Sequence, residues 1–152
     1  MRAEGHIGLS LLVIFGIYTV FQVRSTEMLE LGILITAFST LPDIDIRLEI
    51  AHRKYTHNVT AAIVFGVLMG LLLHHAGVGF MKGFIAGFGG TLLHILGDIP
   101  TYMKFKPLAP FSQARVGLGL FKASNPAVNR SFLLIGAMTF ILYLVIIYVG
   151  II

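Results

Sequence analysis

Five apolar segments, separated by short polar stretches, restrict this chain to a narrow range of folds. They cover residues 5–23, 28–41, 58–73, 78–99 and 131–152. The last holds 22 residues without a charge, enough to cross a hydrocarbon core of about 30 Å as a helix. Charged residues make up only 12% of the 152 positions, against roughly 25% in soluble domains. The sequence predicts an all-α fold: a multi-pass transmembrane helical bundle of about five helices, with residues 1–152 forming a single transmembrane domain.

The first two segments are the least typical spans. Residues 5–23 exceed the apolar core of a signal peptide and no small-residue cleavage site follows, so we expect a retained first helix. Residues 28–41 are short and contain Glu30, so we expect this segment to span only with help from its neighbours.

Lysine and arginine are distributed unevenly between the two sides that five spans create. Nine of the 11 lie with the N-terminus, residues 42–57 and residues 100–130, and two lie on the other side. The positive-inside rule therefore predicts that the N-terminus and both of these connections face the cytoplasm. The same asymmetry accounts for the net charge of +4, so nucleic acid is not expected as a partner.

Residues 100–130 form a cytoplasmic connection rich in proline, aromatic and basic residues. Aromatic and cationic side chains suit a membrane interface. Two interpretations remain open: the segment is a lid that binds anionic lipid head groups, or it is a basic loop that fixes topology.

Potential metal ligands gather at the segment ends that share this side. Ionisable groups at membrane depth are costly unless they pair, meet water or bind a metal, and without cysteine the chain offers no thiolate ligands. The expected convergence therefore predicts a functional site. Its candidate residues are His6, Asp43, Asp45, His52, His57, His94 and Asp98.

Spacing supports three motifs within this set. His94 and Asp98 are four residues apart, so on a helix they share a face and can bind one ion or each other. Asp43 and Asp45 follow Pro42, and paired carboxylates can serve as ligand, bridge or general base, although an aspartate-rich turn is the alternative. His52 and His57 can face one site if a helix begins between them, with Thr56 or Asn58 as N-cap; otherwise they belong to a cytoplasmic anchor.

Two other features are interpreted as structural. His74 and His75 end the third segment on the opposite side, as interfacial histidines beside a glycine turn. Gly83 and Gly87 are spaced for close helix packing rather than for a phosphate loop.

The order of these motifs resembles the YdjM-type family of membrane-bound metal-dependent hydrolases, which includes an inner-membrane protein. The resemblance spans residues 5–112, and its most specific element is the block from His52 and Arg53 to Thr56 and His57. Asn58 stands where the family pattern has serine. The family is in turn distantly similar to zinc-dependent phospholipase C and P1-type nucleases. Those enzymes have a further downstream ligand set, which this chain lacks because no histidine follows His94.

The resemblance implies a hydrolase of the inner membrane that cleaves a phosphoester or another ester in a lipid. Its divalent metal would be zinc or a similar ion, present as one or two ions, with the site facing the cytoplasm. His57, His94 and Asp98 would hold the metal, and His6, Asp43 and His52 would complete that shell or hold a second ion. Asp45 or Asp43 would accept the proton of the attacking water, and Arg53 or Lys54 would neutralise charge on a phosphoryl group. Membrane lipids and an anionic lipid or phosphoester substrate are the expected partners; the oligomeric state stays open.

Two other classes of function fit part of the pattern. A non-enzymatic metal-binding protein, such as a sensor or transport accessory, would use the same ligands, but a transporter needs polar groups along a path to the far side. A membrane-anchored nuclease would need a wide basic groove, which only residues 100–130 can supply.

Overall fold

The protein is helical in the computed structural model, which describes residues 1–47 and 55–149. Two short helices, η1 (Leu41–Asp43) and α3 (Ile44–Arg47), follow the second long helix, and a π-helix, η2 (Val145–Val149), ends the described chain. Within the described ranges there is no strand, only two isolated β-bridges. The all-helical prediction is confirmed. The long helices are α1 (Ala3–Val20), α2 (Thr26–Phe38), α4 (Val59–His75), α5 (Phe80–Asp98) and α6 (Pro126–Leu144).

The five long helices differ in their ability to cross a membrane. Three are long and apolar enough: α1, α5 and α6 extended to Ile147. Helix α4 is apolar with 17 residues, and α2 has only 13. At 1.5 Å per residue α2 extends about 20 Å, well short of a hydrocarbon core of about 30 Å. This agrees with the expectation that the second segment depends on its neighbours.

Polar caps set where three of the helices begin. Ser25 and Asn58 accept hydrogen bonds from the backbone N–H groups of Met28 and Ala61, at 3.4 and 2.9 Å. Asn58 is therefore the N-cap, as one of the two sequence alternatives predicted. Asn125 caps α6, which begins at Pro126 rather than at residue 131. The connection between α5 and α6 is correspondingly shorter than residues 100–130.

Glycine allows the helices to approach closely in pairs. A Cβ atom on Gly136 of α6 would lie 2.1 Å from the carbonyl oxygen of Gly8 on α1. Between α4 and α5, a Cβ atom on Gly83 would lie 2.3 Å from the carbonyl oxygen of Met69. The packing interpretation of Gly83 and Gly87 is confirmed.

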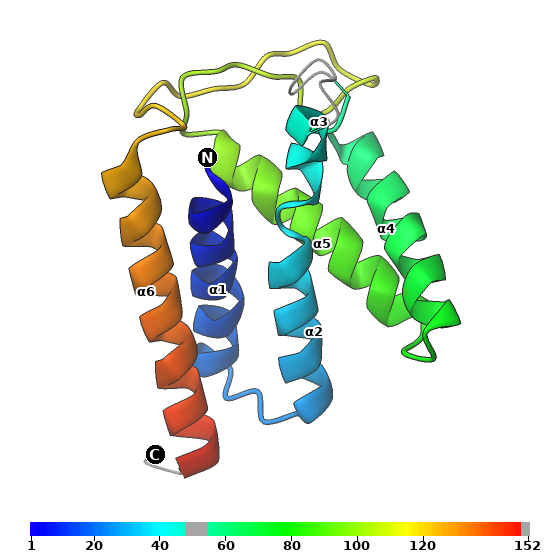
Figure 1. The fold of residues 1–152 in the computed structure, drawn as a ribbon, viewed down its shortest axis with the longest axis vertical. Coiled ribbons are helices and arrows are strands. Elements are labelled where there is room, and N and C mark those ends of the chain that lie inside the picture. The colour runs from blue at the N-terminus through cyan, green and yellow to red at the C-terminus, as the bar shows by residue number, and fades with distance from the viewer. Residues whose placement is uncertain (48–54, 150–152) are drawn as a thin grey trace.

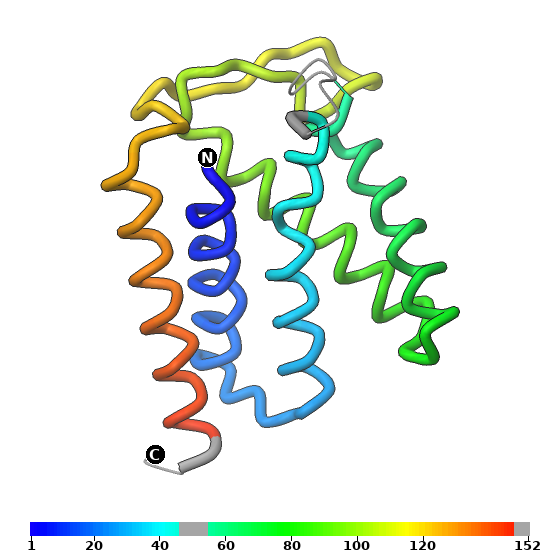
Figure 2. The backbone as a smooth tube through the Cα atoms, in the orientation of Figure 1, coloured from blue at the N-terminus to red at the C-terminus, as the bar shows by residue number. Residues whose placement is uncertain are grey.

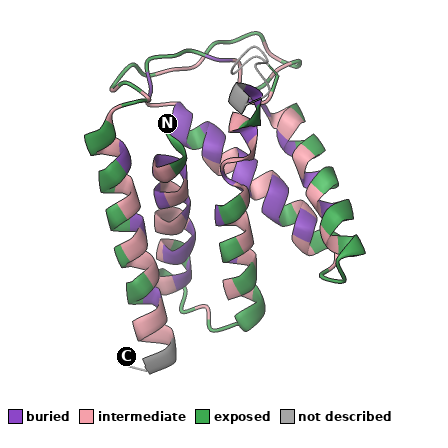
Figure 3. Cartoon of the chain, viewed as in Figure 1, coloured by how far each residue is buried: buried purple, intermediate pink, exposed green. Residues whose placement is uncertain are grey.

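The path of the chain brings one set of helix ends together (Figure 1). The N-terminus, the end of α2 with η1 and α3, the start of α4, the end of α5 and the start of α6 lie at the same end of the bundle, and the connection from α5 to α6 runs across it (Figure 2). Buried residues follow α1 and α5, whereas α4 and α6 present exposed residues on their outer faces (Figure 3). The expected gathering of ligand-bearing helix ends is thus present. We call this the site end and the other the far end.

Candidate metal centre

Five of the predicted ligands meet at the site end and come from four parts of the chain. His6 lies on α1, Asp43 on η1, His57 just before α4, and His94 and Asp98 on the last turns of α5. The three histidines and Asp98 are buried, and the Asp43 side chain is 19% exposed. Desolvated ionisable groups this close together stabilise the fold only when they share protons or a cation.

The ring nitrogens of His57 and His94 form the centre of this cluster. Their Nε2 atoms lie 2.9 Å apart. Asp98 Oδ2 lies 3.3 Å from the first and 3.7 Å from the second. Asp43 Oδ1 lies 3.7 Å from His57 Nε2 and 3.5 Å from His94 Nε2. Four donor atoms therefore form two triangles that share the edge between the two nitrogens.

A backbone carbonyl orients His94. Its Nδ1 lies 2.8 Å from the oxygen of Ser39, at the end of α2. Because a carbonyl oxygen only accepts, Nδ1 carries the hydrogen, and Nε2 of the neutral ring presents a lone pair to the cluster. This is the usual way in which an outer partner orients a metal-binding histidine.

Thr56 and Asp45 orient His57 in the same manner. The Thr56 hydroxyl donates to Asp45 Oδ2 at 2.5 Å and lies 2.8 Å from His57 Nδ1. Since the hydroxyl hydrogen is directed to Asp45, its oxygen can accept from His57 Nδ1–H. His57 Nε2 then also presents a lone pair. Two lone pairs only 2.9 Å apart repel each other unless a proton or a metal ion lies between them.

Burial and two neighbouring carboxylates act in opposite directions on the charge of His57. Burial by itself lowers the pKa of His57, but hydrogen bonds to Asp43 and Asp98 more than offset it, and the net result is a raised pKa. The carboxylates beside the two Nε2 atoms therefore favour a positive charge at this position.

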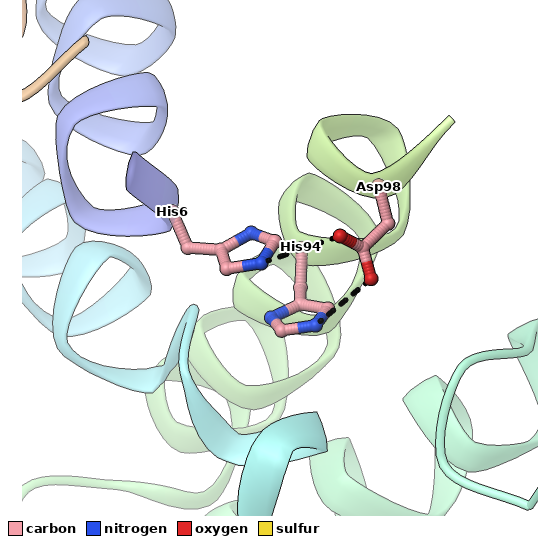
Figure 4. A group of neighbouring side chains, drawn as sticks. All are labelled: His6, His94 and Asp98. Carbon is pink, nitrogen blue, oxygen red and sulfur yellow. Dashed lines mark ion pairs between the residues drawn. The ribbon is translucent and has the colours of Figure 1, made fainter. Parts of the chain in front are cut away.

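A second donor group lies beside the first and shares two of its members. His6, His94 and Asp98 place one ligand atom each within 4.8 Å of one another (Figure 4). The His6 ring is stacked on that of His94 with centroids 3.6 Å apart, and His6 Nε2 lies 3.6 Å from Asp98 Oδ1. Asp98 thus has one oxygen toward His6 and the other toward His57, as in a bridging carboxylate. The ammonium group of Met1 contacts Asp98 and lies 2.9 Å from His6 Nε2, so this position already accommodates a positive charge.

The donor set fits a divalent metal. In tetrahedral zinc sites with bonds of about 2.0–2.1 Å, ligand atoms are separated by roughly 3.3 Å. The two triangles have sides between 2.9 and 3.7 Å, which bracket this separation. Nitrogen and carboxylate donors suit zinc and similar ions. The two triangles offer a position for one ion, whereas at the second donor group the ammonium group of Met1 lies against the same His6 nitrogen and Asp98 oxygen.

The remaining predicted residues take different positions. His52, Arg53 and Lys54 lie outside the described residues. Asp45 is buried on the Nδ1 side of His57, away from the two triangles. His74 and His75 are exposed at the end of α4, at the far end of the bundle, in line with their structural interpretation.

Several contacts at the site were not anticipated from the sequence. The Ser39 carbonyl and the Thr56 hydroxyl have no motif that marks them as partners of histidine. Asn129 on α6 accepts from the backbone N–H of Arg2 at 2.9 Å and donates to the carbonyl oxygens of Ala123 and Asn125. It thereby fixes the start of α1, and with it His6, against α6.

The chain is a multi-pass helical membrane protein with a buried cluster of histidine and aspartate at one end of the bundle. The family model described as "YdjM inner membrane protein" matches residues 1–152. The chain therefore belongs to this family, and the resemblance identified from the motifs is confirmed. No curated protein and no solved structure gives a significant match, so the more distant similarity to phospholipase C and P1-type nucleases stays a prediction.

Proposed function

We propose that this inner membrane protein is a metal-dependent hydrolase that cleaves a phosphoester or another ester of a lipid or membrane-associated substrate, with its site facing the cytoplasm. One observation carries the proposal. The Nε2 atoms of His57 and His94 lie 2.9 Å apart, with a carboxylate oxygen of Asp43 and one of Asp98 close to both. A hydrogen bond at Nδ1 orients each ring. Burial of ionisable side chains is costly in a membrane protein, so a buried group of them that converges on one point indicates a functional site.

The ligand assignment follows from the two donor groups. His57 and His94 would hold one ion together with Asp98. A second ion at His6 and the other oxygen of Asp98 would take the place of the Met1 ammonium group. A bound zinc or similar ion lowers the pKa of a water from about 15.7 towards 7 and polarises the ester oxygen.

The chain's own residues would orient the reactants and move the proton. Asp43 is partly exposed, at 19% of its side chain, so it is the cluster carboxylate best placed to meet a substrate and accept a proton from the attacking water. Asp45, the alternative base, contacts the opposite side of the His57 ring, so we assign it a positioning role. Arg53 keeps its predicted role of neutralising charge on a phosphoryl group.

The activity test uses purified full-length protein in detergent with lipid and soluble ester substrates. We expect release of phosphate, head group or fatty acid that requires an added divalent metal, stops with a chelator, and is absent in His94→Ala. Turnover of soluble esters alone would reject the lipid substrate. No turnover by metal-loaded protein on either class would favour the non-enzymatic alternative.

The orientation has a separate test, because the chain contains no cysteine. Single cysteines at Ser112, in the connection across the site end, and at Gly77, at the far end, should differ in labelling by an impermeant thiol reagent. We expect Gly77→Cys to react in intact cells and Ser112→Cys only after lysis. The reverse pattern would place the site outside the cytoplasm.

A further inference from the structure

An open pocket of about 830 Å³ lies beside the metal centre, between the start of α4 and the connection from α5 to α6. Its volume falls within the roughly 300–1,000 Å³ of pockets that hold small ligands. Its lining includes apolar side chains of α4, among them Ala61, Val64 and Phe65, and the basic residues Lys104, Lys106 and Arg115 of the connection.

Hydrogen bonds hold the two walls together. The backbone N–H of Val59 donates to the carbonyl oxygen of Pro107 at 2.8 Å, and the Thr60 hydroxyl donates to that of Ala109 at 2.9 Å. Phe105 and Val116 exchange backbone hydrogen bonds of 3.1 and 2.8 Å, which places the segment with Lys104 and Lys106 beside Arg115. The basic residues are therefore gathered by the fold itself.

The segment that supplies the basic wall carries no acidic residue of its own. Residues 100–130 contain five lysines and arginines and no aspartate or glutamate. Among the described residues, none of the three basic side chains in the pocket forms an ion pair; Lys106 donates to the Gln113 amide oxygen at 2.6 Å. Lys104 and Arg115 are exposed. This wall is complementary to an anion, and the guanidinium group of Arg115 suits a phosphate in particular.

The apolar wall continues onto the outer face of α4. Val64 is 51% exposed, and Leu68 and Leu72 follow at four-residue intervals with 49% and 55% exposed. Residues four apart lie on one face of a helix, so an apolar stripe leads from the pocket along α4 towards the far end. A ligand with an acyl chain can enter along this stripe without leaving the membrane.

The pocket borders the metal centre through Thr56, the residue that precedes His57. Thr56, whose hydroxyl lies 2.8 Å from His57 Nδ1, also lines the pocket. Phe105 lines it as well, and its buried ring lies 6.2 Å from the His57 ring, measured between centroids. A molecule bound in the pocket therefore lies next to the cluster.

From these observations we infer that the pocket is the binding subsite for an anionic phospholipid of the adjacent leaflet. Lys104 and Arg115 bind its phosphate, and Ala61, Val64 and Phe65 contact the first part of its acyl chain. That this lipid is also the substrate rests on the proposed function; that it binds does not. The pocket does not favour a nucleic acid, since its α4 wall is apolar and continues into the exposed apolar stripe of that helix.

The test measures binding to metal-free full-length protein, so that hydrolysis does not interfere. The probes are short-chain phosphatidic acid and phosphatidylcholine with identical acyl chains. We expect the wild type to prefer phosphatidic acid, and the double variant Lys104→Gln/Arg115→Gln to bind it roughly 10-fold more weakly with little change for phosphatidylcholine. The matched control, Lys122→Gln/Arg130→Gln, removes the same charge from the same basic stretch outside the pocket lining and should keep the preference.

A second pair of variants tests the apolar wall. Val64→Trp fills the pocket and should weaken both lipids, whereas Leu72→Trp, on the same exposed stripe but outside the pocket lining, should weaken neither. Equal loss in the basic double variant and its control, or an oligonucleotide that displaces the lipid, would overturn the inference. Metal-dependent hydrolysis that is unchanged in Lys104→Gln/Arg115→Gln would reject the subsite and keep the hydrolase. Selective binding without any hydrolysis would keep the subsite and reject the hydrolase.

Discussion

The two ends of the bundle contain the same kinds of ionisable residue in opposite environments. At the far end, His74 and His75 are exposed, and Lys82 binds Glu30 at 2.9 Å with 25% and 56% of the two side chains exposed. At the site end, three histidines and Asp98 are buried and lie within a few ångströms of one another. Interfacial polar residues are ordinary in a membrane protein, whereas a desolvated convergent set is not. The candidate site is therefore distinguished by the burial and close approach of its side chains, and not by their residue types.

The largest effect that this comparison predicts is on metal content. We expect His57→Ala and His94→Ala to lose bound divalent metal, with affinity reduced by more than the roughly 100-fold that an outer partner costs, and to lose activity. His74→Ala and His75→Ala are the matched controls and should keep the wild-type metal content. The measurement is elemental analysis of purified protein after dialysis against a defined free zinc concentration.

Folding must be monitored in the same samples, because both histidines are buried. A thermal unfolding transition in the metal-free state, compared with metal-free wild type, separates ligand loss from misfolding. If the folded variants His57→Ala and His94→Ala both retain metal, the buried histidines of the site end do not bind it. The cluster would then consist of side chains that only form hydrogen bonds and ion pairs with one another.

The next effect concerns helix packing along α1 and α6. In the middle of α6, a Cβ atom on Gly136 would lie 2.1 Å from the Gly8 carbonyl oxygen. Further along the same pair, a Cβ atom on Gly16 would find only a methyl carbon of Thr139 at 3.9 Å. We expect Gly136→Ala to destabilise the protein by about 3 kcal/mol, the upper range for overpacking, and Gly16→Ala to be close to neutral. Thermal unfolding in one detergent would measure both, and equal losses would contradict the difference in packing.

A smaller effect is expected at Asp45, which acts through His57. Replacing Asp45 by Asn keeps the size of the side chain but weakens the acceptor for the Thr56 hydroxyl. We expect metal affinity to fall by about 10- to 100-fold, as for other outer partners, so that Asp45→Asn still binds metal at high concentration. Zinc titration with a competing chelator would measure this. Unchanged affinity with a reduced rate would instead restore Asp45 as the general base.

The sequence predicted the helices and the gathering of ligands better than it predicted their fine geometry. The lengths of the apolar segments and the uneven distribution of lysine and arginine are enough to assign each helix end to one side of the membrane. The residues His6, Asp43, His57, His94 and Asp98 could therefore be placed at one end without coordinates. The short helices η1 and α3, which follow α2, could not be located, although Pro42 marks the region. The roles of Ser39, Thr56 and Asn129 depend on backbone carbonyls or single hydroxyl and amide groups that meet only in the folded chain, and such contacts leave no periodic pattern.

The smallest predicted effect is a pH dependence confined to the site end. The folded-state pKa of His57 is raised above its ordinary value of about 6.5, because hydrogen bonds to Asp43 and Asp98 outweigh the effect of burial. A raised pKa contributes stability that is fully present below about pH 6.5 and is lost as the pH rises through the folded value. The unfolding temperature of metal-free protein should therefore decrease as the pH rises above about 6.5, and His57→Gln should reduce this slope, whereas His74→Gln should not. Metal competes with the same proton, so zinc affinity should increase over the same range. Parallel stability curves for wild type and His57→Gln would show that His57 does not hold the proton in the metal-free cluster.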